Sequence, residues 1–123
     1  MDKVLIADDN AGMRKMLCQA LDDEGRSLIL AADGLAALDM ARSELPDLVI
    51  LDMRMPGKDG SQVCAALRAD ERTRAIPVLM LSGLDDESGA ELGLAAGADD
   101  FLAKPFNMRE WGARVSALLG RAA

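Results

Sequence analysis

Short apolar runs alternate along this chain with longer stretches in which apolar residues recur every three or four positions. A short apolar run that ends in a polar residue is typical of a strand buried on both faces of a parallel sheet. A spacing of three and four is typical of a helix with one buried face. This pattern predicts five strands, each followed by a helix. The strands are expected at 4–7, 28–30, 48–51, 77–81 and around 101–102.

The first three predicted helices carry start and stop signals. Asp9 or Asn10 precedes the first helix as a candidate N-cap, and Gly25 follows it. Pro46 ends the second helix, and Asp59 opens the third. Their apolar stripes are expected to be buried: Met13, Met16, Leu17, Ala20 and Leu21; Ala37, Leu38, Ala41 and Leu45; Val63, Ala66 and Leu67.

The last two predicted helices differ in strength. The fourth, which Asp85 caps, contains three glycines between 89 and 97, and each costs about 1 kcal/mol relative to Ala in a helix interior. The fifth begins at Asn107, and Glu110 follows three residues later, as in a capping box. Its expected apolar stripe is Met108, Trp111, Val115, Leu118 and Leu119.

Strict alternation of strands and helices predicts a single doubly wound α/β domain, with a parallel sheet between two helical layers. We expect the flavodoxin-like strand order 2-1-3-4-5, whose switch point lies between strands 1 and 3. Ligands of such sheets bind at the carboxyl ends of the strands, near the switch point. The predicted strands end in polar residues at this edge: Asp8, Asp9, Asp52, Ser82 and Lys104.

Three adjacent carboxylates repel one another, which raises the pKa of at least one of them. A divalent cation removes this conflict, and a set of oxygen ligands suits Mg²⁺. The hydroxyl of Ser82 and the charge of Lys104 suit phosphoryl oxygens, and Asp52 is then the candidate nucleophile. Taken singly, each residue also has a structural interpretation: Asp8 and Asp9 cap a helix, Ser82 ends a strand, and Lys104 is solvated.

Composition restricts the class of partner. The 123 residues carry a net charge of −7, which argues against direct binding of nucleic acid or an anionic membrane. The chain contains no His, so imidazole chemistry is excluded. Cys18 and Cys64 are far apart and are expected to be reduced thiols on helix faces. We find no signal peptide and no apolar stretch long enough to span a bilayer, so a cytoplasmic protein is expected.

The motifs, taken in order, resemble the receiver domain of bacterial two-component response regulators over the whole chain, 1–123. The matching pieces are Asp8-Asp9, the segment 51–57 (LDMRMPG) with Asp59-Gly60, the strand that ends in Ser82, and the segment 97–106 (GADDFLAKPF).

The resemblance implies a role for each site residue. Asp52 accepts a phosphoryl group from a phosphohistidine, and Ser82 and Lys104 contact it. Asp9 and Asp52 ligate Mg²⁺ directly, the backbone carbonyl of Arg54 adds a ligand, and Asp8 acts mainly through water. Phe101 is the switch residue whose rotamer reports the state. The peptide bond between Lys104 and Pro105 is expected to be cis.

The resemblance also implies the partners. A sensor histidine kinase or a phosphotransfer protein supplies the phosphoryl group, and a downstream protein or fused output domain reads it. A phosphorylation-dependent homodimer is a further expectation. The chain is then no enzyme beyond its own phosphorylation and dephosphorylation. Arg54 and Leu84 occupy the variable positions that tune phosphoryl lifetime in the family, and they favour slow self-hydrolysis.

Three other functions share part of this pattern. A haloacid-dehalogenase-like phosphatase needs a second Asp two residues after the nucleophile, where this chain has Arg54. A flavin carrier needs a phosphate loop after strand 1, where Asp8 and Asp9 repel phosphate. A pseudo-receiver binds a partner without phosphorylation, although the presence of all five site residues argues against it.

Overall fold

The computed structural model describes residues 2–22, 26–83, 96–104 and 106–122 of the chain. Five strands and four helices lie in these ranges: β1 Lys3–Ala7, α1 Ala11–Asp22, β2 Ser27–Ala31, α2 Gly34–Glu44, β3 Leu48–Asp52, α3 Gly60–Ala69, β4 Val78–Ser82, β5 Asp100–Ala103 and α5 Met108–Ala122. The fourth predicted helix, the stop at Gly25 and the peptide bond before Pro105 involve residues outside the described ranges.

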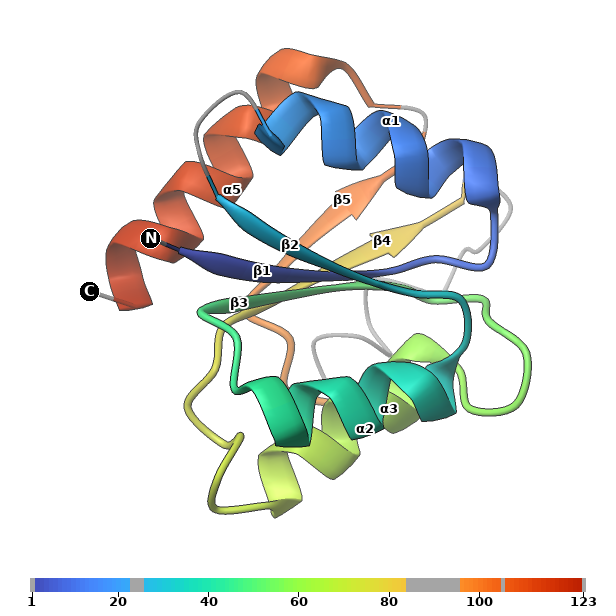
Figure 1. The fold of residues 1–123 in the computed structure, drawn as a ribbon, viewed down its shortest axis with the longest axis vertical. Coiled ribbons are helices and arrows are strands. Elements are labelled where there is room, and N and C mark those ends of the chain that lie inside the picture. The colour runs from blue at the N-terminus through green and yellow to red at the C-terminus, as the bar shows by residue number, and fades with distance from the viewer. Residues whose placement is uncertain (1, 23–25, 84–95, 105, 123) are drawn as a thin grey trace.

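The five strands form one parallel sheet in the order β2-β1-β3-β4-β5, which confirms the prediction. Helices α1 and α5 cover one face of the sheet, and α2 and α3 cover the other (Figure 1). In the β1–β3 pair, Ala7 lies opposite Leu51. The next residues, Asp8 and Asp52, therefore leave two neighbouring strands side by side.

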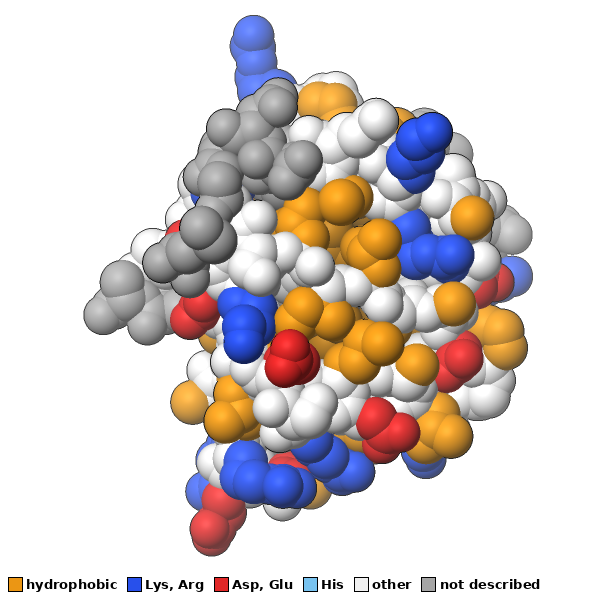
Figure 2. Space-filling model, viewed as in Figure 1, with side chains coloured by type: hydrophobic (Ala, Val, Ile, Leu, Met, Phe, Trp, Pro, Cys, Tyr) orange, Lys and Arg blue, Asp and Glu red, His pale blue; other side chains and the backbone are white. Residues whose placement is uncertain are grey.

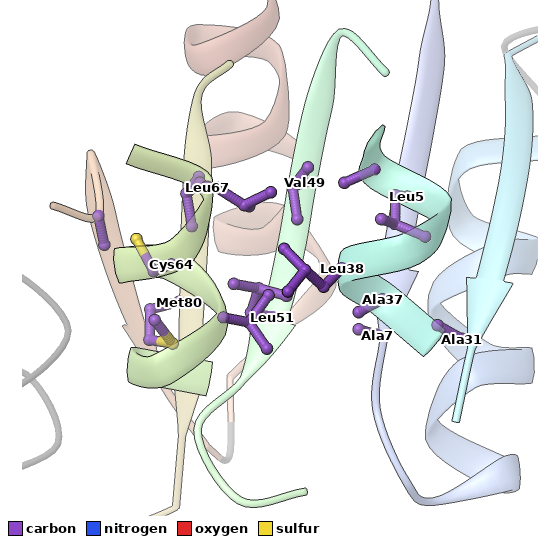
Figure 3. Close-up of a cluster of buried hydrophobic side chains, with 14 of the residues drawn as sticks. Leu5, Ala7, Ala31, Ala37, Leu38, Val49, Leu51, Cys64, Leu67 and Met80 are labelled. Atoms are coloured by element: carbon purple, nitrogen blue, oxygen red, sulfur yellow. The ribbon is translucent and has the colours of Figure 1, made fainter. Parts of the chain in front are cut away.

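Each face of the sheet has its own apolar core. Because side chains alternate along a strand, Leu5 and Ala7 of β1 pack beneath α2 and α3, whereas Val4 and Ile6 pack on the other side, where Trp111 of α5 lies. Figure 3 shows the first of these clusters between the sheet and the two helices. Burial on both faces explains why the inner strands β1, β3 and β4 are continuous apolar runs rather than alternating ones.

The predicted caps lie at the helix ends. Asn10, and not Asp9, caps α1, since its Oδ1 accepts the N–H of Met13 at 3.0 Å. Asp59 and Gln62 form a reciprocal capping box at the start of α3. At α5, the side chain of Asn107 accepts the N–H of Glu110 at 2.8 Å. Asp9 is thus left free of a capping role.

Among the stripe residues whose burial the structure describes, three are exposed, so their predicted burial is wrong: Met16 (43%), Leu45 (52%) and Met108 (42%). Leu45 follows α2 with a left-handed backbone, φ 47°, so it falls off the helical face that the spacing assumes. Met108 is the first residue of α5, ahead of the turn that reaches the sheet. Met16 is exposed on α1, one residue before the fully buried Leu17.

The surface mixes charged and apolar side chains, including those around the β2 edge of the sheet (Figure 2). Two exposed leucines belong to β2 and to the helix that follows it, Leu30 and Leu35. Cys18 and Cys64 are both free, as predicted, and burial raises the pKa of the Cys64 thiol. Within the described ranges, no helix is long and apolar enough to cross a membrane.

Candidate functional site

Three carboxylates meet at the carboxyl edge of the sheet. Oxygens of Asp8, Asp9 and Asp52 lie within 4.8 Å of one another. Asp8 is fully buried and Asp52 is 6% exposed, whereas Asp9 is open to solvent. The β1–β3 register brings Asp8 and Asp52 together, and the turn into α1 adds Asp9. The predicted convergence of these acids is therefore confirmed.

Hydrogen bonds fix Asp8 in this cluster. Its backbone N–H donates to the Ala31 carbonyl at 3.1 Å, which extends the β1–β2 ladder by one residue. Its Oδ1 accepts the N–H of Asn10 at 2.9 Å. A buried carboxylate needs such partners because desolvation of an unpaired charge is costly.

Lys104 supplies the positive charge of the site. Its Nζ lies 3.1 Å from Oδ2 of Asp8 and 3.3 Å from Oδ2 of Asp52. Its backbone N–H donates to the carbonyl of Ser82 at 2.6 Å, which fixes the residue at the end of the β4–β5 pair. Lys104 was expected to contact a phosphoryl group, and its position between two carboxylates was not predicted.

Burial first, and the neighbouring Asp8 carboxylate second, raise the pKa of Asp52 from its usual 3.8 to about 6, although Lys104 opposes the shift. A raised pKa in the cluster was predicted, but from repulsion alone. Burial disfavours the charged form of Lys104, yet Asp52 and Asp8 outweigh it and raise the pKa of the ammonium. At neutral pH, Asp52 is therefore mostly ionised and Lys104 is charged.

The remaining predicted residues lie around this centre. Ser82 is fully buried at the end of β4. Arg54 has an exposed side chain, and its backbone N–H points to Oδ1 of Asp52 at 3.4 Å. Phe101 of β5 is half-buried against the core cluster beneath α2 and α3, opposite Met80 of β4.

The donor set fits Mg²⁺. Ligands of this ion lie about 2.0–2.1 Å from it, so two of them stand at most about 4.2 Å apart. The oxygens of the three carboxylates are already within 4.8 Å, and the exposure of Asp9 leaves room for waters, which Mg²⁺ retains.

Comparison with known proteins agrees with this geometry. Residues 4–116 match the family model described as the response regulator receiver domain. The chain belongs to this family. It is therefore a receiver domain of two-component signalling.

The receiver domain is similar to a transcriptional regulatory protein for alkaline phosphatase synthesis, PhoP, of Bacillus subtilis: the two are 43% identical over 119 residues, which are 97% of this chain and 49% of PhoP. A putative response regulator of Chloroflexus aurantiacus has a structure with a TM-score of 0.92 and 38% identity, covering 97% of this chain and 98% of the other. A third similar structure is the receiver domain of the sensor histidine kinase PA1611 of Pseudomonas aeruginosa, which has magnesium coordinated in its active site cleft. It has a TM-score of 0.89 and 29% identity, and the match covers 97% of this chain and 98% of the other. The chain thus spans about half the length of curated relatives such as PhoP.

Gly60, which belongs to the matching Asp59-Gly60 motif but was given no role of its own, lies against the backbone of Asp52. A Cβ at this position would lie 2.5 Å from the carbonyl oxygen of Asp52 and 3.0 Å from the Cα of Met53. The N–H of Gly60 donates to the carbonyl of Met53 at 2.9 Å. Only glycine therefore lets α3 begin against the backbone that carries Asp52.

We expect Gly60→Ala to destabilise the receiver domain by about 1–3 kcal/mol, because the methyl group overpacks the end of β3. Gly112→Ala in α5 is the matched control, since a Cβ there meets no atom within 4 Å. It should stabilise the domain by about 0.5–1 kcal/mol. Urea unfolding measures both, and equal effects of the two substitutions would contradict the close contact at Gly60.

Proposed function

We propose that this receiver domain takes a phosphoryl group onto Asp52 from the phosphohistidine of a sensor histidine kinase or a phosphotransfer protein. The observation that carries the proposal is the position of Asp52, at the carboxyl end of the central strand between Asp8 and Lys104. This arrangement combines a nucleophilic carboxylate, a place for a cation and a mobile positive charge in one small site.

The chemistry is a direct transfer. A carboxylate oxygen of Asp52 forms a bond to phosphorus while the bond from phosphorus to the donor imidazole nitrogen breaks, and the electron pair of that bond stays on the nitrogen. The donor ring takes up one proton from solvent, so the products are an acyl phosphate and a neutral histidine. With a pKa of about 6, Asp52 is mainly ionised at pH 7.5 and so is ready to attack. Lys104 is close enough to pair with a phosphoryl oxygen once Asp52 carries the group, and the Ser82 hydroxyl is proposed to donate to another.

Asp9 and Asp52 would hold Mg²⁺ directly, together with the backbone carbonyl of Arg54, and Asp8 would act through water. When bound, the ion neutralises developing negative charge on the phosphoryl oxygens. The fit of the carboxylate oxygens and the magnesium reported for the receiver domain of PA1611 support this assignment. The proposed reaction is limited to the phosphorylation and dephosphorylation of Asp52, so the chain is not proposed to be an enzyme with a separate substrate.

Incubation with acetyl phosphate and Mg²⁺, followed by intact mass, separates the candidate functions. A phosphoacceptor gains the mass of a single phosphoryl group. An Asp-nucleophile phosphatase hydrolyses the donor through many turnovers. The presence of Arg54, at the position where such a phosphatase needs an acid, argues against this function. A pseudo-receiver shows neither change, and that result would overturn the proposed function.

The proposed switch runs from Ser82 to Phe101. A phosphoryl group on Asp52 draws the Ser82 hydroxyl toward it, and Phe101 rotates into the space that is released. The surface of the predicted fourth helix, β5 and α5 then changes for a partner or a second copy of the chain. The half-buried position of Phe101, on the strand paired with the one that ends in Ser82, supports this route.

We expect Phe101→Ala to leave phosphorylation of Asp52 intact but to uncouple it from the surface. In the wild type, beryllofluoride should change hydrogen exchange most between Ser82 and Lys104, and the substitution should reduce this change strongly. Leu35→Ala, which removes an exposed leucine of α2, is the control and should leave the change as it is. A response concentrated in α2 instead would show that the output surface is elsewhere.

The output is proposed to be a downstream protein or a fused domain. Curated relatives such as PhoP are named as transcriptional regulators, and this chain matches only about half of their length. A phosphorylation-dependent homodimer and a cytoplasmic location are part of the same proposal, and direct contact with nucleic acid is not expected of a domain with net charge −7.

A further inference from the structure

We infer that Arg14 of α1 is a positioning residue for the acidic cluster. Arg14 holds the β1–α1 turn in the conformation that orients Asp9 toward the proposed metal site. Its guanidinium Nη1 donates to the backbone carbonyl of Asp8 at 2.7 Å. This inference rests on the proposed binding of Mg²⁺ by the cluster.

Arg14 closes the β1–α1 turn from both of its ends. Its backbone N–H donates to the carbonyl of Asn10 at 3.0 Å, while its side chain reaches back to the carbonyl of Asp8. Asp9 lies between these two anchored carbonyls. Since Asp9 is the exposed member of the cluster, and Asn10 caps the helix, the bond from Arg14 fixes the backbone on which the Asp9 carboxylate stands.

The other two carboxylates have separate supports. Asp8 is fully buried and its carboxylate bonds to Asn10 and Lys104, and Asp52 ends a central strand and faces Lys104. Asp9 depends on the turn for its orientation. Residues that hydrogen-bond the ligands of a metal typically contribute about 10–100-fold to its affinity. Arg14 bonds the backbone beside Asp9 rather than the carboxylate itself, so we expect an effect at the lower end of this range.

Charge and position predict opposite effects of removing Arg14. If the guanidinium acted only by its charge, its loss would strengthen Mg²⁺ binding, because a cation near the site repels a second cation. If it holds the turn, its loss should weaken binding. The direction of the change in Mg²⁺ dissociation constant therefore separates the two roles, and a general loss of stability does not mimic it in a variant that stays folded.

The test is a titration of the full chain with MgCl₂ at constant ionic strength, followed by amide NMR shifts. We expect Arg14→Met to raise the Mg²⁺ dissociation constant about tenfold. Arg14→Lys keeps a donor and a charge, so its constant should lie closer to the wild type. Lys15→Met removes the same charge from an exposed neighbour and should leave the constant equal or slightly lower.

Each outcome has a definite meaning. An unchanged or lower dissociation constant for Arg14→Met overturns the positioning role. A value for Arg14→Lys as high as that for Arg14→Met overturns it too, since the restored donor then has no effect. If the wild type itself shows no Mg²⁺ response, the proposed metal site fails, and the failure is distinguishable from a failure of Arg14 alone. Amide spectra without Mg²⁺ establish that each variant is folded.

Discussion

Asp52→Asn is expected to abolish phosphorylation of the receiver domain and to leave its fold intact. The amide is nearly isosteric with the carboxylate, and Lys104 keeps Asp8 as an ion-pair partner. An amide is not a nucleophile toward phosphorus under these conditions, so the variant should gain no phosphoryl group from acetyl phosphate and Mg²⁺. Intact mass of the wild type and the variant, side by side, measures the effect.

The same substitution should change the pH dependence of stability. Because the pKa of Asp52 is raised to about 6, the folded state binds this proton more tightly than the unfolded state. The contribution of Asp52 to stability is then fully present below about pH 4 and is lost as the pH rises through about 6. Above pH 6, the raised pKa lowers the free energy of unfolding by at most about 3 kcal/mol.

We therefore expect Asp52→Asn in EDTA to be more stable than the wild type at pH 8, and to lack the wild-type decline between pH 4 and 6. Urea unfolding at a series of pH values measures both effects. Asp39→Asn, an exposed acid of α2, is the control and should follow the wild type. A variant that is less stable than the wild type at pH 8 would contradict the raised pKa of Asp52.

Asp9→Ala is expected to remove most of the response of the receiver domain to Mg²⁺. In the wild type, millimolar Mg²⁺ should raise the melting temperature, because an ion that binds the folded cluster but not the unfolded chain stabilises the folded state. The variant lacks one of the three carboxylates of the cluster, so the increase in melting temperature with Mg²⁺ should disappear. Without metal the variant should be slightly more stable, since a like charge has gone from beside Asp8 and Asp52.

Asp39→Ala is the matched control for this experiment, because it removes an exposed carboxylate of α2 instead. It should keep the wild-type response to Mg²⁺. A wild-type melting temperature that does not depend on Mg²⁺ would exclude the metal site. An undiminished response in Asp9→Ala would show that Asp9 is not a ligand.

Much of the fold and the site was predictable because the three inner strands are buried on both faces. Their apolar runs marked the strands, and the polar residue at each carboxyl end marked the site edge. The strand order then predicted that Asp8 and Asp52 lie side by side, as the register shows. Burial was predicted less well for residues at the edges of the helical stripes. Met16 and Leu45 match the apolar spacing but are exposed. Spacing alone shows neither where the buried face of a helix ends nor that Leu45 has a left-handed backbone.

The finer contacts around the acidic cluster were not predictable. No sequence pattern shows that Lys104 lies within 3.3 Å of two carboxylates, because the contact joins strand ends far apart in the chain. The sequence indicated that a helix opens at Asp59, but the need for glycine at position 60 arises from the approach of α3 to the Asp52 backbone. The hydrogen bond from Arg14 to Asp8 likewise depends on the path of the turn.

Borohydride reduction of the phosphorylated receiver domain, followed by peptide mass spectrometry, tests the assignment of Asp52 most directly. Borohydride converts an aspartyl phosphate to homoserine and leaves free carboxylates unchanged, so the modified residue keeps a permanent label. We predict homoserine at position 52 alone, only after treatment with both acetyl phosphate and Mg²⁺. Homoserine at position 8 or 9, or its absence from a chain that binds Mg²⁺, would contradict the assignment of Asp52 as the phosphoacceptor.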